Sequence, residues 1–183
     1  MNAKDQFASE ADAIFDNLYL GSQEAASAPL DQLKARGITH VFIAAHLKDY
    51  TYEQHGSELV YKQLHVEDNP SYPILPLLPE AIAFIKEGRK SGGVLVHCQY
   101  GISRSASFVI AYLMALNRWD FEEAWRFVGR KRPAVASNLM MFKDQLKLWH
   151  RLQYSLPASL PSSTALSLTN REQKYLVRHP KNS

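Results

Sequence analysis

The chain has 183 residues, enough for one ordinary domain that buries about two thirds of the surface exposed by its unfolded form. Hydrophobic residues make up 46 % and charged residues 21 % of the sequence, which excludes a wholly disordered, collagen-like or coiled-coil chain. The net charge of +3 is unevenly spread, because residues 1–97 carry −5, residues 98–154 carry +5 and residues 155–183 carry +3. A basic second half fits nucleic acid, anionic lipid or a phosphorylated substrate.

Targeting signals and membrane spans are not expected. The longest interior apolar run, which contains Val109–Leu116, is far shorter than the roughly 20 residues that cross a bilayer. The N-terminal Met1–Asp5 is polar and lacks the apolar core of a secretory signal. Cys98 is the only cysteine, which excludes an intrachain disulfide and a cysteine-rich zinc site, and the seven histidines form no close ligand pair. We therefore expect a cytoplasmic or nuclear protein without a metal site.

Apolar periodicity in the first part of the chain predicts strands separated by short helices and one polar loop. In chain order these are a strand Ile14–Leu20, a short helical stretch after Gly21-Ser22, a helix from Pro29 to Gly37, a strand Ile38–Ala45, a loop Leu47–Ser57 and a strand Leu59–Val66.

The remaining elements are mainly helices. They are a helix from about Leu77 to Lys90, a buried central strand Val94–Val96, a helix Ser105–Leu116, a helix from the Asp120/Glu123 capping box to near Gly129, and a last helix from Asn138 to about Tyr154. This order predicts a single-domain α/β fold with a central, mostly parallel sheet flanked by helices. We place the domain at residues 13–154, between a flexible N-terminus at 1–12 and a flexible, basic tail rich in Ser and Pro at 155–183.

One segment, Val94–Ser105, reads as a strand, a loop and a helix, with Cys98 at the end of the strand. Backbone N–H groups of such a loop converge on an anion, and Gly101 permits a positive φ or a close backbone approach. Arg104 and the helix N-terminus add positive charge, which stabilises both a bound phosphate and a thiolate. A lone cysteine is more often a small buried hydrophobe, but the neighbouring residues favour a nucleophilic Cys98 in a phosphate cradle.

The segment from His97 to Ser105, with the pattern His-Cys-x-x-Gly-x-x-Arg-Ser, resembles the cysteine-dependent protein phosphatases and among them the dual-specificity phosphatases. The similarity extends over about residues 12–154 and includes Leu18–Ser22, Gly37–Val41 and Ala111–Met114. The resemblance implies a protein tyrosine phosphatase-like fold, no cofactor, and a phosphorylated protein as substrate.

The resemblance also implies a two-step mechanism. Cys98 attacks phosphorus, and Asp68, in the segment Val66–Pro70, protonates the leaving oxygen and then activates water for hydrolysis of the phosphocysteine. The phosphate is bound by the loop residues Cys98, Gln99, Tyr100, Gly101, Ile102, Ser103 and Arg104. Ser105 bonds the thiolate, while His97 and Asn138 support the loop.

Simpler interpretations stand beside these roles. Asp68 also fits a turn residue before Asn-Pro, with Glu67 and Asp49 as rival acids, and Ser105 and Asn138 also fit helix caps. Two departures from the family pattern affect the site. Tyr100 occupies a position that is usually small, which leaves substrate preference open, and Ser137 precedes Asn138 where proline is usual.

Other functions use the same kind of loop. A phosphoinositide or RNA 5′-phosphatase is one alternative, although the loop lacks the lysine typical of enzymes acting on highly charged lipids. Nucleic-acid binding through Arg130–Arg132 is weakly indicated, because three basic residues usually form a solvated helix end. A phospho-binding pseudophosphatase would normally lack the cysteine or the acid. We therefore predict a protein phosphatase acting on phosphotyrosine and on phosphoserine or phosphothreonine. A protein kinase is one candidate substrate, and the oligomeric state is left open.

Overall fold

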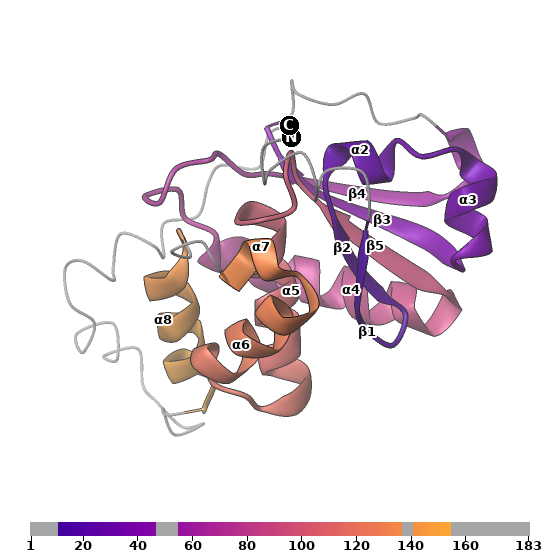
Figure 1. Ribbon diagram of the computed structural model, residues 1–183. Coiled ribbons are helices and arrows are strands. Elements are labelled where there is room, and N and C mark those ends of the chain that lie inside the picture. The colour runs from indigo at the N-terminus through magenta and orange to yellow at the C-terminus, as the bar shows by residue number, and fades with distance from the viewer. Residues whose placement is uncertain (1–10, 47–54, 137–140, 155–183) are drawn as a thin grey trace.

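A five-stranded sheet forms the centre of the molecule (Figure 1). The computed structural model describes residues 11–46, 55–136 and 141–154. In spatial order the strands are β1 (Asp12–Phe15), β2 (Leu18–Gly21), β5 (Gly93–His97), β3 (Ile38–Ala45) and β4 (Val60–His65). Only the pairing of β1 with β2 is antiparallel. The predicted α/β fold, with a mostly parallel sheet and the segment around Val94–Val96 at its centre, is confirmed.

Helices cover both faces of this sheet (Figure 1). They are α2 (Gln23–Ala26), α3 (Leu30–Ala35), α4 (Leu78–Ser91), α5 (Arg104–Asn117), α6 (Phe121–Lys131), α7 (Pro133–Ala136) and α8 (Lys143–Tyr154), with 3₁₀ turns at Gly56–Glu58 and Leu75–Leu77. Successive side chains of a strand point to opposite faces. Accordingly Val94 and Val96 pack in the large cluster beneath α4, α5, α6 and α8, whereas Leu95 packs with Leu33 in the smaller cluster on the other face.

Helix α5 is the most deeply buried helix of the described chain. All residues from Arg104 to Met114 are buried, and Phe108 packs on Phe42 of β3 with ring centroids 5.2 Å apart. Packing on this scale fixes the helix against the sheet. Since α5 begins at Arg104, the core determines where the end of the candidate phosphate loop lies.

The predicted single strand Ile14–Leu20 is wrong, because the chain reverses within it. Residues Asp16 and Asn17 form a turn between β1 and β2, and Phe15 pairs with Leu18. Asn17 adopts a φ of 55°, which asparagine tolerates better than most residues. Arg89 of α4 donates to the Asp16 carbonyl at 2.6 Å and holds the turn. The hairpin places Asp12 opposite Leu20, so paired structure begins one residue before the predicted domain start.

The C-terminal helices also differ from the prediction. Helix α8 begins at Lys143 rather than at Asn138, which lies outside the described residues. A separate short helix, α7, begins at Pro133, because a proline cannot continue the hydrogen bonding of α6. The predicted capping box is confirmed. The Asp120 carboxylate accepts from Glu123 N at 2.8 Å, and Asp120 N donates to the Glu123 carboxylate at 2.9 Å.

The described residues lack two kinds of feature. In the segments 11–46, 55–136 and 141–154 no helix combines the length and apolar character needed to span a membrane. The same segments contain no group of three or more His, Cys, Asp or Glu side chains that could hold a metal ion.

Candidate active site

Two of the predicted site residues, Cys98 and Asp68, lie where parallel strands end. Cys98 directly follows β5, the central strand, and Asp68 follows β4 after a short connection. In open α/β sheets, ligands bind outside the carboxyl ends of the strands. The sheet topology therefore brings together two residues that are 30 positions apart in the sequence.

The thiol of Cys98 is 3 % exposed and has one close hydroxyl partner. Ser105 donates from Oγ to the Cys98 sulfur at 3.1 Å. The residue at the N-cap of α5 is Ser103, so the interpretation of Ser105 as the helix cap is wrong. A hydroxyl at this distance stabilises negative charge on the sulfur more than it stabilises the neutral thiol.

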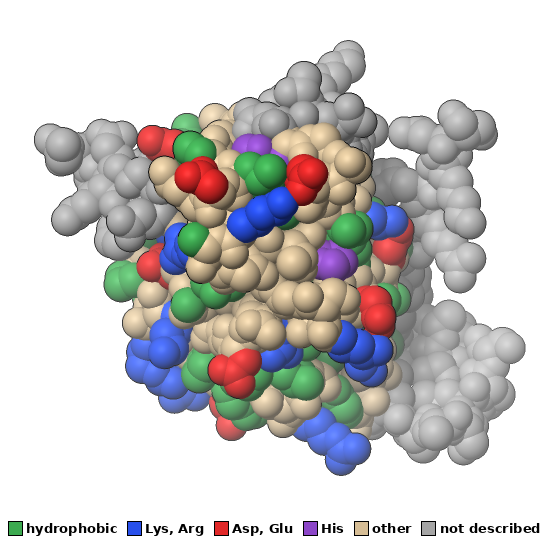
Figure 2. Space-filling model, turned by 90° about the vertical axis from the view of Figure 1, so that its right-hand side faces the viewer, with side chains coloured by type: hydrophobic (Ala, Val, Ile, Leu, Met, Phe, Trp, Pro, Cys, Tyr) green, Lys and Arg blue, Asp and Glu red, His purple; other side chains and the backbone are tan. Residues whose placement is uncertain are grey.

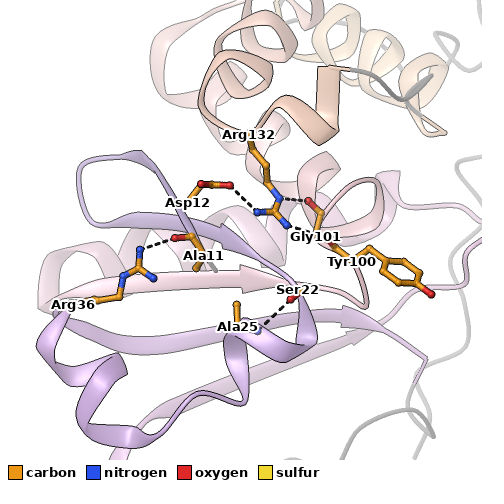
Figure 3. A network of polar contacts seen from close by, with 8 residues as sticks. All are labelled: Ala11, Asp12, Ser22, Ala25, Arg36, Tyr100, Gly101 and Arg132. Carbon is orange, nitrogen blue, oxygen red and sulfur yellow. Dashed lines mark hydrogen bonds and ion pairs between the residues drawn. The ribbon is translucent and has the colours of Figure 1, made fainter. Parts of the chain in front are cut away.

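Three consecutive carbonyl groups of the loop after Cys98 are held from outside the loop. Gln23 N of α2 donates to Gln99 O at 3.2 Å, while Arg132 donates from Nη2 to Tyr100 O at 3.0 Å and from Nε to Gly101 O at 2.8 Å (Figure 3). In a trans peptide the next residue's N–H points opposite to the carbonyl. The N–H groups that follow these carbonyls are therefore turned away from α2 and Arg132. Successive N–H groups with this orientation form an anion-binding concavity.

Gly101 meets both predicted requirements for glycine in this loop. Its φ is +67°, in the left-handed region that side chains disfavour. A Cβ at this position would overlap the carbonyl oxygen of Gly21 and would lie 2.9 Å from Arg132 Nη2. The loop can therefore approach β2 and Arg132 this closely only with glycine at position 101.

The prediction that Arg130–Arg132 form a solvated basic helix end is wrong for Arg132. Its side chain is 1 % exposed, and Nη1 donates to the Asp12 carboxylate at 2.7 Å. Arg130 and Lys131 are exposed as expected. The difference arises because α6 ends at Lys131 and the backbone of Arg132 is extended before Pro133, which directs this side chain beneath the loop. The proline is the one sequence signal that separates Arg132 from its two neighbours.

Arg104 and Asp68 lie close together in the structure. Arg104 is 5 % exposed, whereas the Asp68 side chain is 53 % exposed, and Nε of Arg104 lies 3.6 Å from Oδ1 of Asp68. The rival acid Glu67 lies 3.7 Å from Nε2 of His65. The other rival, Asp49, lies outside the described residues. The geometry thus favours Asp68 over Glu67 as the acid that faces the loop.

The segment after Asp68 is held by Gln145 of α8, which is 1 % exposed. Its Oε1 accepts from Ile74 N at 2.8 Å, and its Nε2 donates to Tyr72 O at 2.8 Å. Asn69 Oδ1 also accepts from Ser71 N at 2.9 Å, which closes the turn next to Asp68. The two buried bonds of Gln145 and the exposed turn bond of Asn69 together fix the path of the segment that carries the acid.

Two other predicted residues have different positions. Tyr100 is 45 % exposed, so its ring stands at the surface beside the loop. Asn138 cannot be placed, since residues 137–140 lie outside the described part of the chain.

His97 lies at the end of β5 with Nδ1 3.4 Å from the Cys98 carbonyl oxygen. Burial lowers the pKa of His97 from 6.5 to about 4, and the imidazole is therefore neutral at neutral pH. A neutral, buried ring beside the Cys98 carbonyl agrees with the predicted supporting position better than with a proton carrier.

This pKa predicts a specific loss of stability in acid. Between pH 6.5 and 4 the unfolded chain binds a proton at His97 that the folded chain does not, so the free energy of unfolding falls as pH falls through this range. When the pH is lowered from 7 to 4.5, the free energy of unfolding measured in urea should fall by about 2 kcal/mol more for the wild type than for His97→Asn. Carboxylates common to both proteins cancel in this comparison. An equal loss in the two proteins would contradict the buried, neutral histidine.

The comparisons with known proteins agree with this geometry. The family model described as dual specificity phosphatase, catalytic domain, matches residues 18–152. The chain is 40 % identical over 134 residues to MAP kinase phosphatase with leucine-rich repeats protein 3 of Dictyostelium discoideum, covering 73 % of this chain and 15 % of that protein. It is 40 % identical over 145 residues to human dual specificity protein phosphatase 1, covering 75 % and 38 %.

A solved structure gives the same result for the fold. The human tyrosine phosphatase-like serine/threonine/tyrosine-interacting protein superposes with a TM-score of 0.71 at 31 % identity, covering 79 % of this chain and 98 % of that one. By contrast, the chain spans only 15 % and 38 % of the two curated relatives.

Proposed function

Since the chain belongs to the dual specificity phosphatase catalytic domain family, we propose that it is a protein phosphatase that acts through a phosphocysteine on Cys98. Its substrates are phosphotyrosine and phosphoserine or phosphothreonine residues. The observation that carries this proposal is the joint placement of Cys98, Arg104 and Asp68 at one edge of the sheet, with Ser105 Oγ 3.1 Å from the sulfur.

Binding uses the loop and Arg104. The N–H groups opposite the three held carbonyls donate hydrogen bonds to the phosphate oxygens. The Arg104 guanidinium donates two parallel N–H bonds to the same phosphate group. A phosphate dianion above a thiolate is repelled unless positive charge compensates both. The buried guanidinium and the N-terminus of α5 supply that charge.

In the first step the Cys98 sulfur attacks phosphorus. A P–S bond forms while the P–O bond to the substrate side chain breaks, and the leaving oxygen takes the proton of the Asp68 carboxyl group. This carboxyl group lies 3.6 Å from Nε of Arg104, the residue that binds the same phosphoryl group. The dephosphorylated side chain then departs.

In the second step a water molecule attacks the phosphocysteine. Asp68, now a carboxylate, takes a proton from the water, the P–S bond breaks, and inorganic phosphate leaves. The electron pair of the broken bond returns to sulfur as a thiolate. The Ser105 hydroxyl group donates a hydrogen bond to this sulfur and so stabilises the thiolate as it leaves.

Asp68→Asn tests the assignment of the acid. We expect turnover of a phosphoserine peptide to fall about 100-fold or more, because general acid catalysis contributes on that order when the leaving group is poor. An aryl phosphate with an acidic leaving group should lose much less, since its oxygen departs without a proton. Turnover with both substrates is measured at matched pH.

Glu67→Gln is the matched control, since Glu67 is the adjacent carboxylate and lies toward His65. Its turnover should equal that of the wild type. If Glu67→Gln loses the activity and Asp68→Asn keeps it, the acid is wrongly assigned.

A phosphorylated protein kinase is the proposed physiological substrate. The support is the name of one relative, a MAP kinase phosphatase, at 40 % identity. Capture of phosphoproteins by Asp68→Ala from cell extract, with release by orthovanadate, tests this assignment. If the variant captures only phosphorylated proteins that are not kinases, the assignment of a kinase as substrate is wrong.

A phosphate-binding protein without turnover is the alternative from another class, and one structural relative is named as a phosphatase-like interacting protein. The wild type would then retain phosphopeptides without releasing inorganic phosphate.

A nucleic-acid substrate is not supported by the charge distribution on the face of the molecule that includes α3. On this face, Figure 2 shows basic and acidic side chains interspersed rather than one broad basic patch.

A further inference from the structure

The N-terminal hairpin reaches the phosphate loop through one ion pair. Asp12, the first residue of β1, lies before Leu18, where the family match begins. Its carboxylate accepts from Nη1 of Arg132, which is 120 positions away in the sequence. Figure 3 shows Arg132 between Asp12 on one side and the backbone of Tyr100 and Gly101 on the other.

The guanidinium of Arg132 is held at three of its nitrogens. Nε and Nη2 donate to the two loop carbonyls at 2.8 and 3.0 Å, and Nη1 donates to Asp12 at 2.7 Å. Because a guanidinium is rigid and planar, the bond at Nη1 fixes the plane in which the other two N–H groups point. Asp12 therefore determines how accurately Arg132 meets the loop.

The ion pair between Arg132 and Asp12 also indicates that Asp12 keeps Arg132 in place. Arg132 is 1 % exposed, whereas the side chain of Asp12 is 35 % exposed and forms its ion pair. A buried guanidinium that loses its carboxylate is strongly destabilised where it lies. Without Asp12, movement of Arg132 toward water would release both carbonyls, and the N–H groups opposite them would lose their fixed direction.

We propose that Asp12, acting through Arg132, is a positioning residue for the phosphate loop, so that the β1–β2 hairpin is part of the phosphate-binding machinery. The proposal deepens the proposed function and rests on the same loop. It does not require that Asp12 touch the substrate.

The same strand offers a matched control. Arg36, at the end of α3, donates from Nη2 to the carbonyl of Ala11 at 2.6 Å and lies over the Tyr19 ring at 5.3 Å. Like Arg132, it anchors the start of β1, but Figure 3 shows it far from the phosphate loop. Arg36→Met removes a hairpin anchor without touching a loop carbonyl.

The experiment measures binding of inorganic phosphate to Asp12→Asn, Arg132→Met, the double variant and Arg36→Met. Phosphate protects Cys98 from alkylation by iodoacetate, and because Cys98 is the only cysteine, mass spectrometry reads this protection directly. Asp12→Asn should weaken phosphate binding about tenfold, because it disturbs a charged hydrogen bond. Arg132→Met should weaken phosphate binding more, because it removes several such bonds. Arg36→Met should bind phosphate like the wild type.

The double variant separates positioning from general stability. If Asp12 acts through Arg132, the double variant should bind phosphate no more weakly than Arg132→Met alone. Independent additive losses, or an equal loss in Arg36→Met, would overturn the proposal. The proposal would also be overturned if Asp12→Asn melts at a lower temperature than the wild type but binds phosphate with the same affinity. Phosphate protection without turnover of any phosphopeptide would refute the proposed function and leave this inference intact.

Discussion

Replacing Cys98 with serine should reduce turnover of every substrate by on the order of 10⁴-fold or more, because removing a catalytic nucleophile has effects of this size. The side chain is almost fully buried and serine is slightly smaller, so the fold should survive. A hydroxyl is not ionised at neutral pH, and the contact with Ser105 at 3.1 Å would then join two neutral hydroxyl groups. The measurement is release of inorganic phosphate from a phosphotyrosine peptide.

Binding provides the control for this variant. Cys98→Ser should still bind the phosphopeptide, because Arg104 and the loop N–H groups are unchanged. Measurable turnover that matches the wild type would remove Cys98 from the mechanism. Loss of both turnover and binding would show that the substitution disrupts the loop, and a thermal melt would then distinguish unfolding from local change.

Gly101→Ala should reduce phosphate binding and turnover by about 10³-fold, an effect of the size seen when a preorganised row of N–H donors is disrupted. The added methyl would overlap the Gly21 carbonyl and crowd Nη2 of Arg132, at a φ of +67°. The loop would have to move away from β2 and release the two carbonyls that Arg132 holds. Phosphate protection of Cys98 and turnover measure the effect.

Gly37→Ala is the matched control. Gly37 also has a positive φ, of +73°, but no atom lies within 4 Å of an added Cβ. This variant should lose about 1 kcal/mol of stability and keep its activity. If the two variants lose activity equally, backbone strain and not the close approach at Gly101 explains the effect.

The central part of the site could be predicted because its signals are local. Three apolar residues at Val94–Val96 mark a buried strand, and Cys98, Gly101 and Arg104 follow it within a single loop. The alternation of core residues along β3 and β5 follows from the pleat of the sheet. Asp68 required the family resemblance in addition, since its own segment predicts only a turn.

The outer parts of the site depend on contacts between distant segments. The sequence pattern does not reveal the β1–β2 hairpin, because each strand has only four residues and together they resemble one continuous strand. In the sequence Arg132 resembles part of a basic helix end. Its position in the fold depends on where α6 ends and on Asp12, which lies near the N-terminus. Gln145 likewise contacts a segment more than 70 positions earlier, which no local pattern reveals.

The most direct measurement is the location of the phosphoryl group during turnover. Asp68→Asn is mixed with an aryl phosphate whose leaving group is acidic, so that the first step proceeds without Asp68. The reaction is quenched in acid within the first turnover, and the protein is digested for mass spectrometry. If Asp68 activates the water of the second step, its removal should make a phosphoryl group accumulate on the peptide that contains Cys98. Release of inorganic phosphate with no labelled Cys98, or with the label on another residue, would contradict a mechanism through phosphocysteine.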